Sequence, residues 1–205
     1  MNKNSWFRLV ALVMVVIGLA FYRVSPNKVK EQNIIAEIQL HQSPGSIHFF
    51  QLVSDSISFF SLGIPAIFLV SGLIKKRKVW VRNALIILLG ISLGGLISAV
   101  LKRTIREPRP YEVDARITQW SVGGSNSFPS GHTVEATAAA IGFSMILFRT
   151  PISIVLSVIW ALTIMFSRIV LGVHNFTDIL GGMAIGCIGL LIVHQVFEKF
   201  PLKSP

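Results

Sequence analysis

The chain has 205 residues, of which 52% are hydrophobic and only 14% are charged. Soluble domains carry about 25% charged residues, so this composition excludes an ordinary soluble protein and indicates helices that face lipid. The formal net charge is +10, but the positive residues lie mostly between apolar runs, which indicates membrane lipids and anionic ligands as partners rather than nucleic acid. A single cysteine excludes both a disulfide framework and a cysteine-rich metal site.

Apolar runs of about 20 residues, long enough to cross a bilayer, recur along the chain. They predict an all-α fold, a six-span transmembrane helical bundle. The first run also resembles a signal peptide, because Lys3 and Arg8 flank it, but no small-residue cleavage site follows and we interpret it as a retained anchor. The predicted spans are residues 6–22, 57–74, 81–101, 132–149, 152–171 and 179–197.

The segment between the first two spans is mixed in character and is interrupted by Pro26 and Pro44. Within it, the stretch 29–40 is predicted to lie along the membrane interface as an amphipathic helix. We therefore expect a single membrane domain over residues 1–205. An anchor span and an interfacial segment fill residues 1–56, and the core follows over residues 57–197.

The basic residues also predict an orientation. An even number of spans puts both termini on one side, and that side holds four consecutive basic residues at 75–78. Short loops rich in lysine and arginine face the cytoplasm. We expect a multi-pass protein of the cell membrane whose termini are cytoplasmic. Residues 102–131 and 172–178 then lie on the extracytoplasmic side.

Three blocks of chemically distinctive residues stand at ends of predicted spans, all on this outer face. The first runs from Lys102 to Arg109 and Pro110, where the third span ends. A guanidinium matches phosphate oxygens in shape, and an ammonium group supplies a mobile point charge. Taken alone, such a cluster is also typical of an interfacial anchor.

The second block is Pro129-Ser130-Gly131-His132, which opens the fourth span. Ser130 is a candidate N-cap, and Gly131 lets a ligand approach the backbone closely. The N–H groups and the dipole of a helix start attract an anion, and His132 is placed to give a proton to a leaving group. The alternative is an ordinary capped helix with an interfacial histidine.

The third block holds Ser167 and Arg168, then His174, then Asp178. If the sixth span begins early, the spacing of four residues puts His174 and Asp178 on one helix face. A carboxylate behind an imidazole fixes its tautomer and leaves the other ring nitrogen to attack phosphorus. The alternative is a buried pair that holds two helices together.

In this order and at these spacings, the blocks resemble the type 2 phosphatidic acid phosphatase family. The family pattern is lysine, six residues and Arg-Pro; then Pro-Ser-Gly-His; then Ser-Arg, five residues, histidine, three residues and aspartate. The chain matches every motif position, and the resemblance covers about residues 57–197. The family includes bacterial phosphatidylglycerophosphate and undecaprenyl pyrophosphate phosphatases.

The resemblance implies an active site at the outer membrane interface and a metal-independent lipid phosphatase without a cofactor. His174 would be the nucleophile that forms a phosphohistidine, oriented by Asp178, and His132 would protonate the leaving oxygen and then activate water. A metal held by these three residues is disfavoured, because the neighbouring cations would repel it. The phosphate-binding residues would be Lys102, Arg109, Ser130, Gly131 and Arg168.

Other functions stay open at this point. A lipid phosphotransferase would use the same residues, and a small anion-binding membrane transporter is a more remote alternative, because no span carries a charge at its middle. The short loops favour a lipid phosphate with a small headgroup as the substrate. A second phosphate could bind to one of the further arginines of this loop, Arg103, Arg106 and Arg116. We therefore rank undecaprenyl pyrophosphate ahead of phosphatidylglycerophosphate and phosphatidic acid as the expected substrate. The sequence predicts no oligomeric state.

Overall fold

The structure, a computed structural model, describes residues 15–16 and 28–200. In this part of the chain the regular elements are all helices and there is no strand, which confirms the predicted all-α class. The elements are α2 (Lys28–Leu40), α3 (Pro44–Asp55), α4 (Ile57–Ile74), α5 (Lys78–Ile105), α6 (Pro110–Val113), α7 (Gly131–Gly142), the π-helical continuation η1 (Phe143–Phe148), α8 (Pro151–Val170) and α9 (Phe176–Glu198).

The described residues contain five segments long and apolar enough to cross a membrane. The predicted span at 6–22 lies almost entirely outside the described residues. The next span is longer than predicted, because α3 and α4 follow one another with only Ser56 between them. The five segments are Pro44–Ile74, Lys78–Val113, Gly131–Phe148, Pro151–Val170 and Phe176–Glu198.

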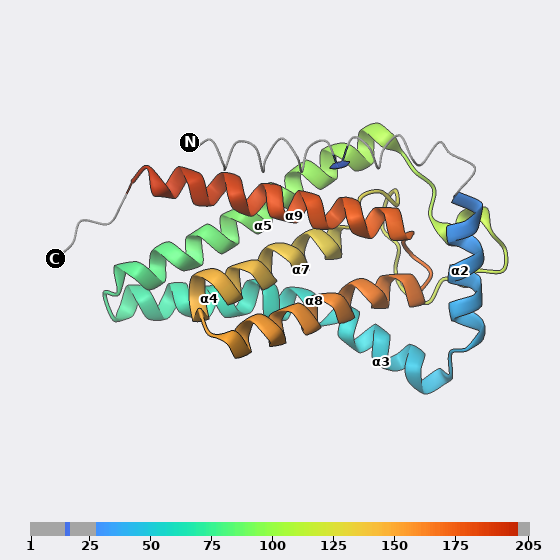
Figure 1. The fold of residues 1–205 in the computed structure, drawn as a ribbon, viewed down its shortest axis with the longest axis horizontal. Coiled ribbons are helices and arrows are strands. Elements are labelled where there is room, and N and C mark those ends of the chain that lie inside the picture. Colours follow the sequence, from blue (N-terminus) through green and yellow to red (C-terminus); the bar gives the residue numbers. More distant parts are fainter. Residues whose placement is uncertain (1–14, 17–27, 201–205) are drawn as a thin grey trace.

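Helix α7 lies at the centre of the bundle and packs against α5, α8 and α9 (Figure 1). Glycines bring α9 into backbone contact with it, as small residues do between membrane helices. A Cβ atom on Gly182 would lie 2.7 Å from the carbonyl oxygen of Ser130, and one on Gly186 would lie 2.6 Å from that of Val134. The first turns of α7 and α9 therefore lie side by side.

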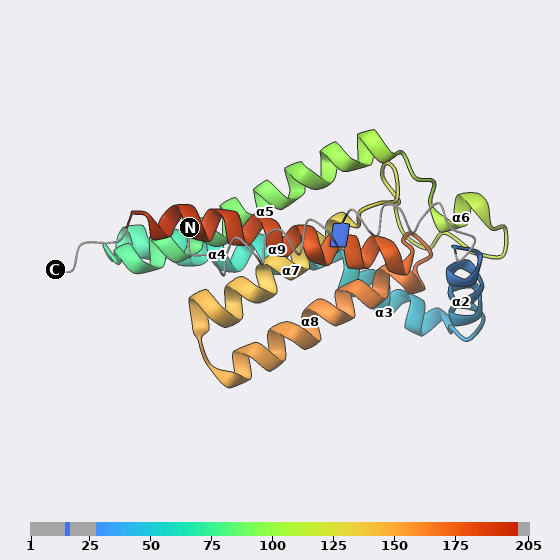
Figure 2. The same cartoon turned by 45° about the horizontal axis from the view of Figure 1, so that its top comes forward.

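Helix α2 lies across one end of the bundle, as Figures 1 and 2 show. The predicted helix is present, and its buried side carries two polar residues beside the apolar Ile35 and Ala36. Ile34 is 50% exposed, whereas Glu31 and Gln39 are buried together with Ile35. These two polar side chains are buried because they bond to other elements, and α2 is thereby fixed to the bundle.

The loop after α5 folds back over the ends of the spans. Helix α5 ends at Ile105, and the capping residue that follows, Arg106, has a left-handed backbone with a φ of 53°. The N–H of Trp120 then donates to the carbonyl of Leu171, and the N–H of Ser127 donates to that of Glu107. Gly172 has a φ of 72°, and a Cβ there would lie 2.5 Å from the carbonyl oxygen of Thr118. The loop is thus held against the ends of α5 and α8.

Candidate active site

A cavity of about 790 Å³ opens where α5 ends, α7 begins and α8 ends. The loop residues from Trp120 to Ser125 and one side of α3 complete its wall. The three sequence blocks, which are far apart in the chain, meet at this cavity. Six of the eight predicted site residues line it, namely Lys102, Arg109, Gly131, His132, Arg168 and His174.

The two predicted residues that do not line the cavity lie directly behind it. Ser130 is fully buried, and its hydroxyl caps α7 by accepting from the N–H of Thr133 at 3.4 Å. Its own N–H donates to the carbonyl of Asp178 at 3.1 Å. A Cβ on Gly131 would meet no atom within 4 Å, so the backbone at the start of α7 is open toward the cavity.

His174 and Asp178 are in contact, but not across a helix face as the spacing suggested. Helix α9 begins only at Phe176, with Asn175 as its N-cap, so His174 precedes the helix. Asp178 reaches back to the turn before it, and its Oδ2 lies 3.3 Å from Nδ1 of His174. The contact therefore follows from the geometry of a helix cap.

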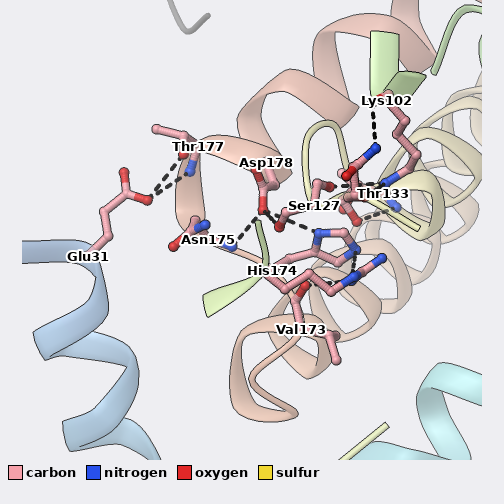
Figure 3. Close-up of polar contacts among 12 residues, drawn as sticks. Glu31, Lys102, Ser127, Thr133, Val173, His174, Asn175, Thr177 and Asp178 are labelled. Atoms are coloured by element: carbon pink, nitrogen blue, oxygen red, sulfur yellow. Dashed lines mark hydrogen bonds and ion pairs between the residues drawn. The ribbon is translucent and has the colours of Figure 1, made fainter. Parts of the chain in front are cut away.

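The Oδ2 atom of Asp178 is the centre of a small network (Figure 3). It accepts the N–H of Asn175 at 2.8 Å and the hydroxyl of Ser127 at 2.5 Å, in addition to its contact with His174. All four residues are buried. The carboxylate is thus fixed from the loop and from its own helix, and it fixes the imidazole in turn.

The second ring nitrogen of His174 faces a guanidinium. Nη1 of Arg109 lies 3.4 Å from Nε2, and because arginine can only donate, Nε2 must be the accepting nitrogen. Nδ1 then carries the hydrogen and donates to Asp178, so both contacts require the same neutral tautomer. Burial, together with the positive charges of Arg109, Arg168 and Lys102, holds the pKa of His174 well below its ordinary value. The ring is neutral, with a lone pair on Nε2.

Backbone carbonyls hold two of the three predicted phosphate-binding cations. Nη1 of Arg109 donates to the carbonyl of Val173 at 2.6 Å, and its Nε donates to that of Ser125 at 2.8 Å. Nζ of Lys102 donates to the carbonyls of Asn126 and Ser127 at 2.6 and 3.0 Å. Both cations are therefore positioned by the loop that closes over them.

Arg168, the third cation, has side-chain partners instead. It is 2% exposed, and its Nη1 donates to the hydroxyl of Ser54, which is fully buried in α3. The hydroxyl of Ser121 lies 3.4 Å from the same nitrogen, and Asp55 is a nearby negative charge at the cavity wall. Helix α3 therefore belongs to the site, although the sequence blocks lie elsewhere.

Glu31 supports the site from a greater distance. Its carboxylate accepts the N–H and the hydroxyl of Thr177 at 3.4 and 3.2 Å, so α2 caps the first turn of α9 (Figure 3). Burial is the main reason why the pKa of Glu31 is raised. The sequence alone does not identify Glu31, Ser54 or Ser127 as site residues, because none of them forms a recognisable motif with its hydrogen-bond partner.

The family model described as PAP2 superfamily matches residues 83–201. Phosphatidylglycerophosphatase B of Bacillus subtilis is 32% identical over 146 residues, which cover 66% of this chain and 68% of that protein. Lipid A 4'-phosphatase of Porphyromonas gingivalis is 28% identical over 182 residues, which cover 83% of this chain and 72% of that protein.

Two solved structures share the fold. The crystal structure of a transmembrane PAP2 type phosphatidylglycerolphosphate phosphatase from Bacillus subtilis matches with a TM-score of 0.80, covering 97% of this chain and all of that one. The crystal structure of Aquifex aeolicus LpxE matches with a TM-score of 0.67, covering 80% and 93% of the two chains. Both are 24% identical to this chain, so these likenesses describe the fold alone.

The lowered pKa of His174 predicts an acid-dependent loss of stability. Below the unfolded pKa of about 6.5, the unfolded chain binds a proton that the folded chain does not, so stability falls as the pH falls. In detergent, we expect the Tm of the wild type to fall relative to that of His174→Gln between about pH 7.5 and 5.5.

Tryptophan fluorescence during thermal unfolding measures both curves. His41→Gln, which removes an exposed histidine just after α2, is the matched control and should follow the wild type. Parallel curves for the wild type and His174→Gln would contradict a neutral buried imidazole.

Proposed function

Because the chain belongs to the PAP2 superfamily, we propose that it is a membrane lipid phosphatase that acts through a phosphohistidine. Its reaction is the hydrolysis of a phosphomonoester or pyrophosphate of a lipid, without a metal. One observation carries the proposal: two histidines, three cations and a helix start share one cavity, and Asp178 orients the ring of His174. The phosphatase names of the similar proteins support it.

In the first step, Lys102, Arg109 and Arg168 bind the phosphoryl oxygens, together with the N–H of Gly131. Phosphoryl transfer depends on charge neutralisation and in-line positioning, and three cations beside a helix start supply both. Nε2 of His174 attacks phosphorus as the bond to the lipid oxygen breaks. Protonated His132 gives its proton to that oxygen, and Asp178 stabilises the positive ring that forms.

In the second step, neutral His132 takes a proton from a water molecule. The water oxygen attacks phosphorus, the bond from phosphorus to Nε2 breaks, and inorganic phosphate is released. Oδ2 of Asp178 keeps its bonds from Ser127 and Asn175 throughout, so the ring returns to its starting orientation and tautomer. In this scheme Ser130 positions Gly131 and His132 by capping α7, rather than by touching the phosphate.

Variants of the histidines test this scheme. His174→Ala should abolish turnover and the phosphoenzyme, and Asp178→Asn should lower kcat at least about 100-fold, because the ring loses its charged partner. His132→Gln should still form a phosphoenzyme from a nitrophenyl phosphate, whose leaving group needs no proton, but should hydrolyse it slowly.

His194→Ala, near the far end of α9, is the matched control and should keep full activity. Labelled phosphate retained on the denatured protein measures the phosphoenzyme, and excess chelator should leave turnover unchanged. Turnover by His174→Ala at the wild-type rate, or loss of activity in chelator that zinc restores, would contradict the scheme.

We also propose a topology of six spans in a single membrane domain. Both termini are cytoplasmic, and the cavity faces the extracytoplasmic side. Lys76 lies in the turn between α4 and α5, at the opposite end of α5 from Lys102, and basic turns favour the cytoplasm. In a Cys187→Ala background, an impermeant thiol reagent added to intact cells should label Gln119→Cys but not Lys76→Cys. The reverse pattern would place the active site in the cytoplasm.

The cavity changes the ranking of substrates. Arg103, Arg106 and Arg116 do not line it, and Arg116 is paired with Asp114 at 2.6 Å. The cations that line the cavity suffice for one phosphoryl group, and a second phosphate bonded directly to it, as in a pyrophosphate, would meet the carboxylate of Asp55 at the wall. In phosphatidylglycerophosphate a glycerol separates the two phosphates. We therefore place phosphatidylglycerophosphate, the substrate class of the B. subtilis relative's name, ahead of undecaprenyl pyrophosphate.

The ratio of kcat/KM for the two lipids in one detergent system measures this preference. We expect phosphatidylglycerophosphate to be favoured at least about tenfold, which corresponds to about 1.4 kcal/mol in transition-state binding. Asp55→Asn should raise kcat/KM for undecaprenyl pyrophosphate toward the value for phosphatidylglycerophosphate, because it removes the carboxylate that repels the second phosphate of the pyrophosphate. A preference for undecaprenyl pyrophosphate would reverse the ranking and leave the reaction class unchanged.

A further inference from the structure

A second cavity, of about 630 Å³, lies at the other end of the bundle and shares no residue with the first. It is formed where α4 ends, α5 begins and α9 ends, at the left end of the bundle in Figure 1. Lys78 and Lys102 are 24 positions apart on α5, so roughly 36 Å of helix separates the two cavities. Its apolar lining includes Leu73, Leu85, Phe197 and Phe200.

The body of this groove is apolar and open to the surroundings. Leu73 of α4 and Phe200, just after α9, both line it and are 61% and 74% exposed. Gly72 forms its base because α4 and α5 touch there; a Cβ on Gly72 would lie 3.0 Å from Val81. In a membrane, such a groove between helices accommodates acyl chains rather than water.

The rim of the groove is positively charged. Lys76, Lys78 and Arg82 all line it, and Glu198 is the nearby carboxylate, 3.4 Å from Nη2 of Arg82. The first turn of α5, which begins at Lys78, has no side-chain cap, so its N–H groups add a partial positive charge. Three cations against one carboxylate leave a site for an anion directly beside apolar walls.

We propose that this groove, formed by α4, α5 and α9, binds one anionic phospholipid. The acyl chain lies along Leu73, Leu85 and Phe197, and the phosphate group lies among Lys76, Lys78 and Arg82. Basic residues next to membrane helices attract acidic headgroups in this way, and long basic side chains can cover an apolar surface while their charges stay at headgroup depth. The site is separate from catalysis, so it does not depend on the proposed reaction.

Electrostatic repulsion argues against a second possible occupant of the groove, the predicted first span of the same chain. The predicted first span, residues 6–22, lies almost entirely outside the described residues and is apolar enough to fill the groove. However, Lys3 and Arg8 would bring further positive charge to the basic rim if this segment lay there with its start at the same end. An anionic lipid neutralises the rim, whereas the chain's own basic segment would add to the repulsion.

Native mass spectrometry of the full chain, released from detergent with a defined phospholipid, tests the proposal. The probes are phosphatidylserine, which is anionic and has no phosphomonoester, and phosphatidylethanolamine with the same acyl chains. The triple variant Lys76→Gln/Lys78→Gln/Arg82→Gln removes the rim charges. The matched control, Lys75→Gln/Arg77→Gln/Lys199→Gln, removes the same charge from the same end without touching the groove lining.

The wild type should bind one phosphatidylserine at least tenfold more tightly than phosphatidylethanolamine, a difference of about 1.4 kcal/mol. The rim variant should lose this preference, while the control variant keeps it within about twofold. Leu85→Trp, which fills the apolar part, should weaken binding of both lipids. Turnover of a short-chain soluble phosphate by each variant reports that the protein is folded.

Three results would overturn the proposal. Equal loss of phosphatidylserine binding in the rim and control variants would mean attraction by surface charge alone. Equal affinity of the wild type for both lipids would mean that the positive charges of the rim do not contribute to lipid binding. A disulfide between Leu85→Cys and a cysteine placed within residues 6–22, in a Cys187→Ala background, would identify the first span as the occupant.

Discussion

Three positive charges converge on one cavity at the end of the bundle, and their mutual repulsion has to be offset before any ligand arrives. Two unit charges 4 Å apart repel by about 4 kcal/mol even at an effective dielectric constant of 20. The loop between α5 and α7 supplies the compensation, because its carbonyls accept from Lys102 and Arg109. Arg168, the most deeply buried of the three, is held by hydroxyls instead. Much of the loop between α5 and α7 therefore serves to hold these cations together at the cavity.

Asp178 contacts one ring nitrogen of His174, and Arg109 faces the other. Its carboxylate collects donors from the loop, from its own helix cap and from His174, so one side chain links the cavity wall to the start of α9. The backbone contact of Gly182 with Ser130 then brings the first turn of α9 beside that of α7. His132 and His174 therefore reach the cavity from two adjacent helix starts, which is a rigid way to fix their separation.

Sequence alone predicts the parts of this arrangement that repeat with a period or stand in a motif. The apolar runs locate α4, α5, α8 and α9 to within a few residues, because lipid imposes a length on each. The motif spacings identify six of the residues that line the cavity. What sequence could not provide are partners without a pattern: Ser54 lies 114 positions from Arg168, and Glu31 lies 146 from Thr177. For the same reason the sequence predicts that Arg103, Arg106 and Arg116 could bind a second phosphate, whereas the fold shows that they do not line the cavity.

The contact between Ser54 and Arg168 has a consequence for where the catalytic unit begins. The family model covers residues 83–201, yet the hydroxyl that holds this guanidinium comes from α3 and the carboxylate that caps α9 comes from α2. A fragment trimmed to the matched segment would keep every motif residue and still lack both partners. A hydrogen bond to a buried charge contributes about 1.5–3 kcal/mol, so Arg168 would lose one of the contacts that orient it. A shortened or grafted version of this scaffold therefore has to include α2, well before the first motif residue, Lys102.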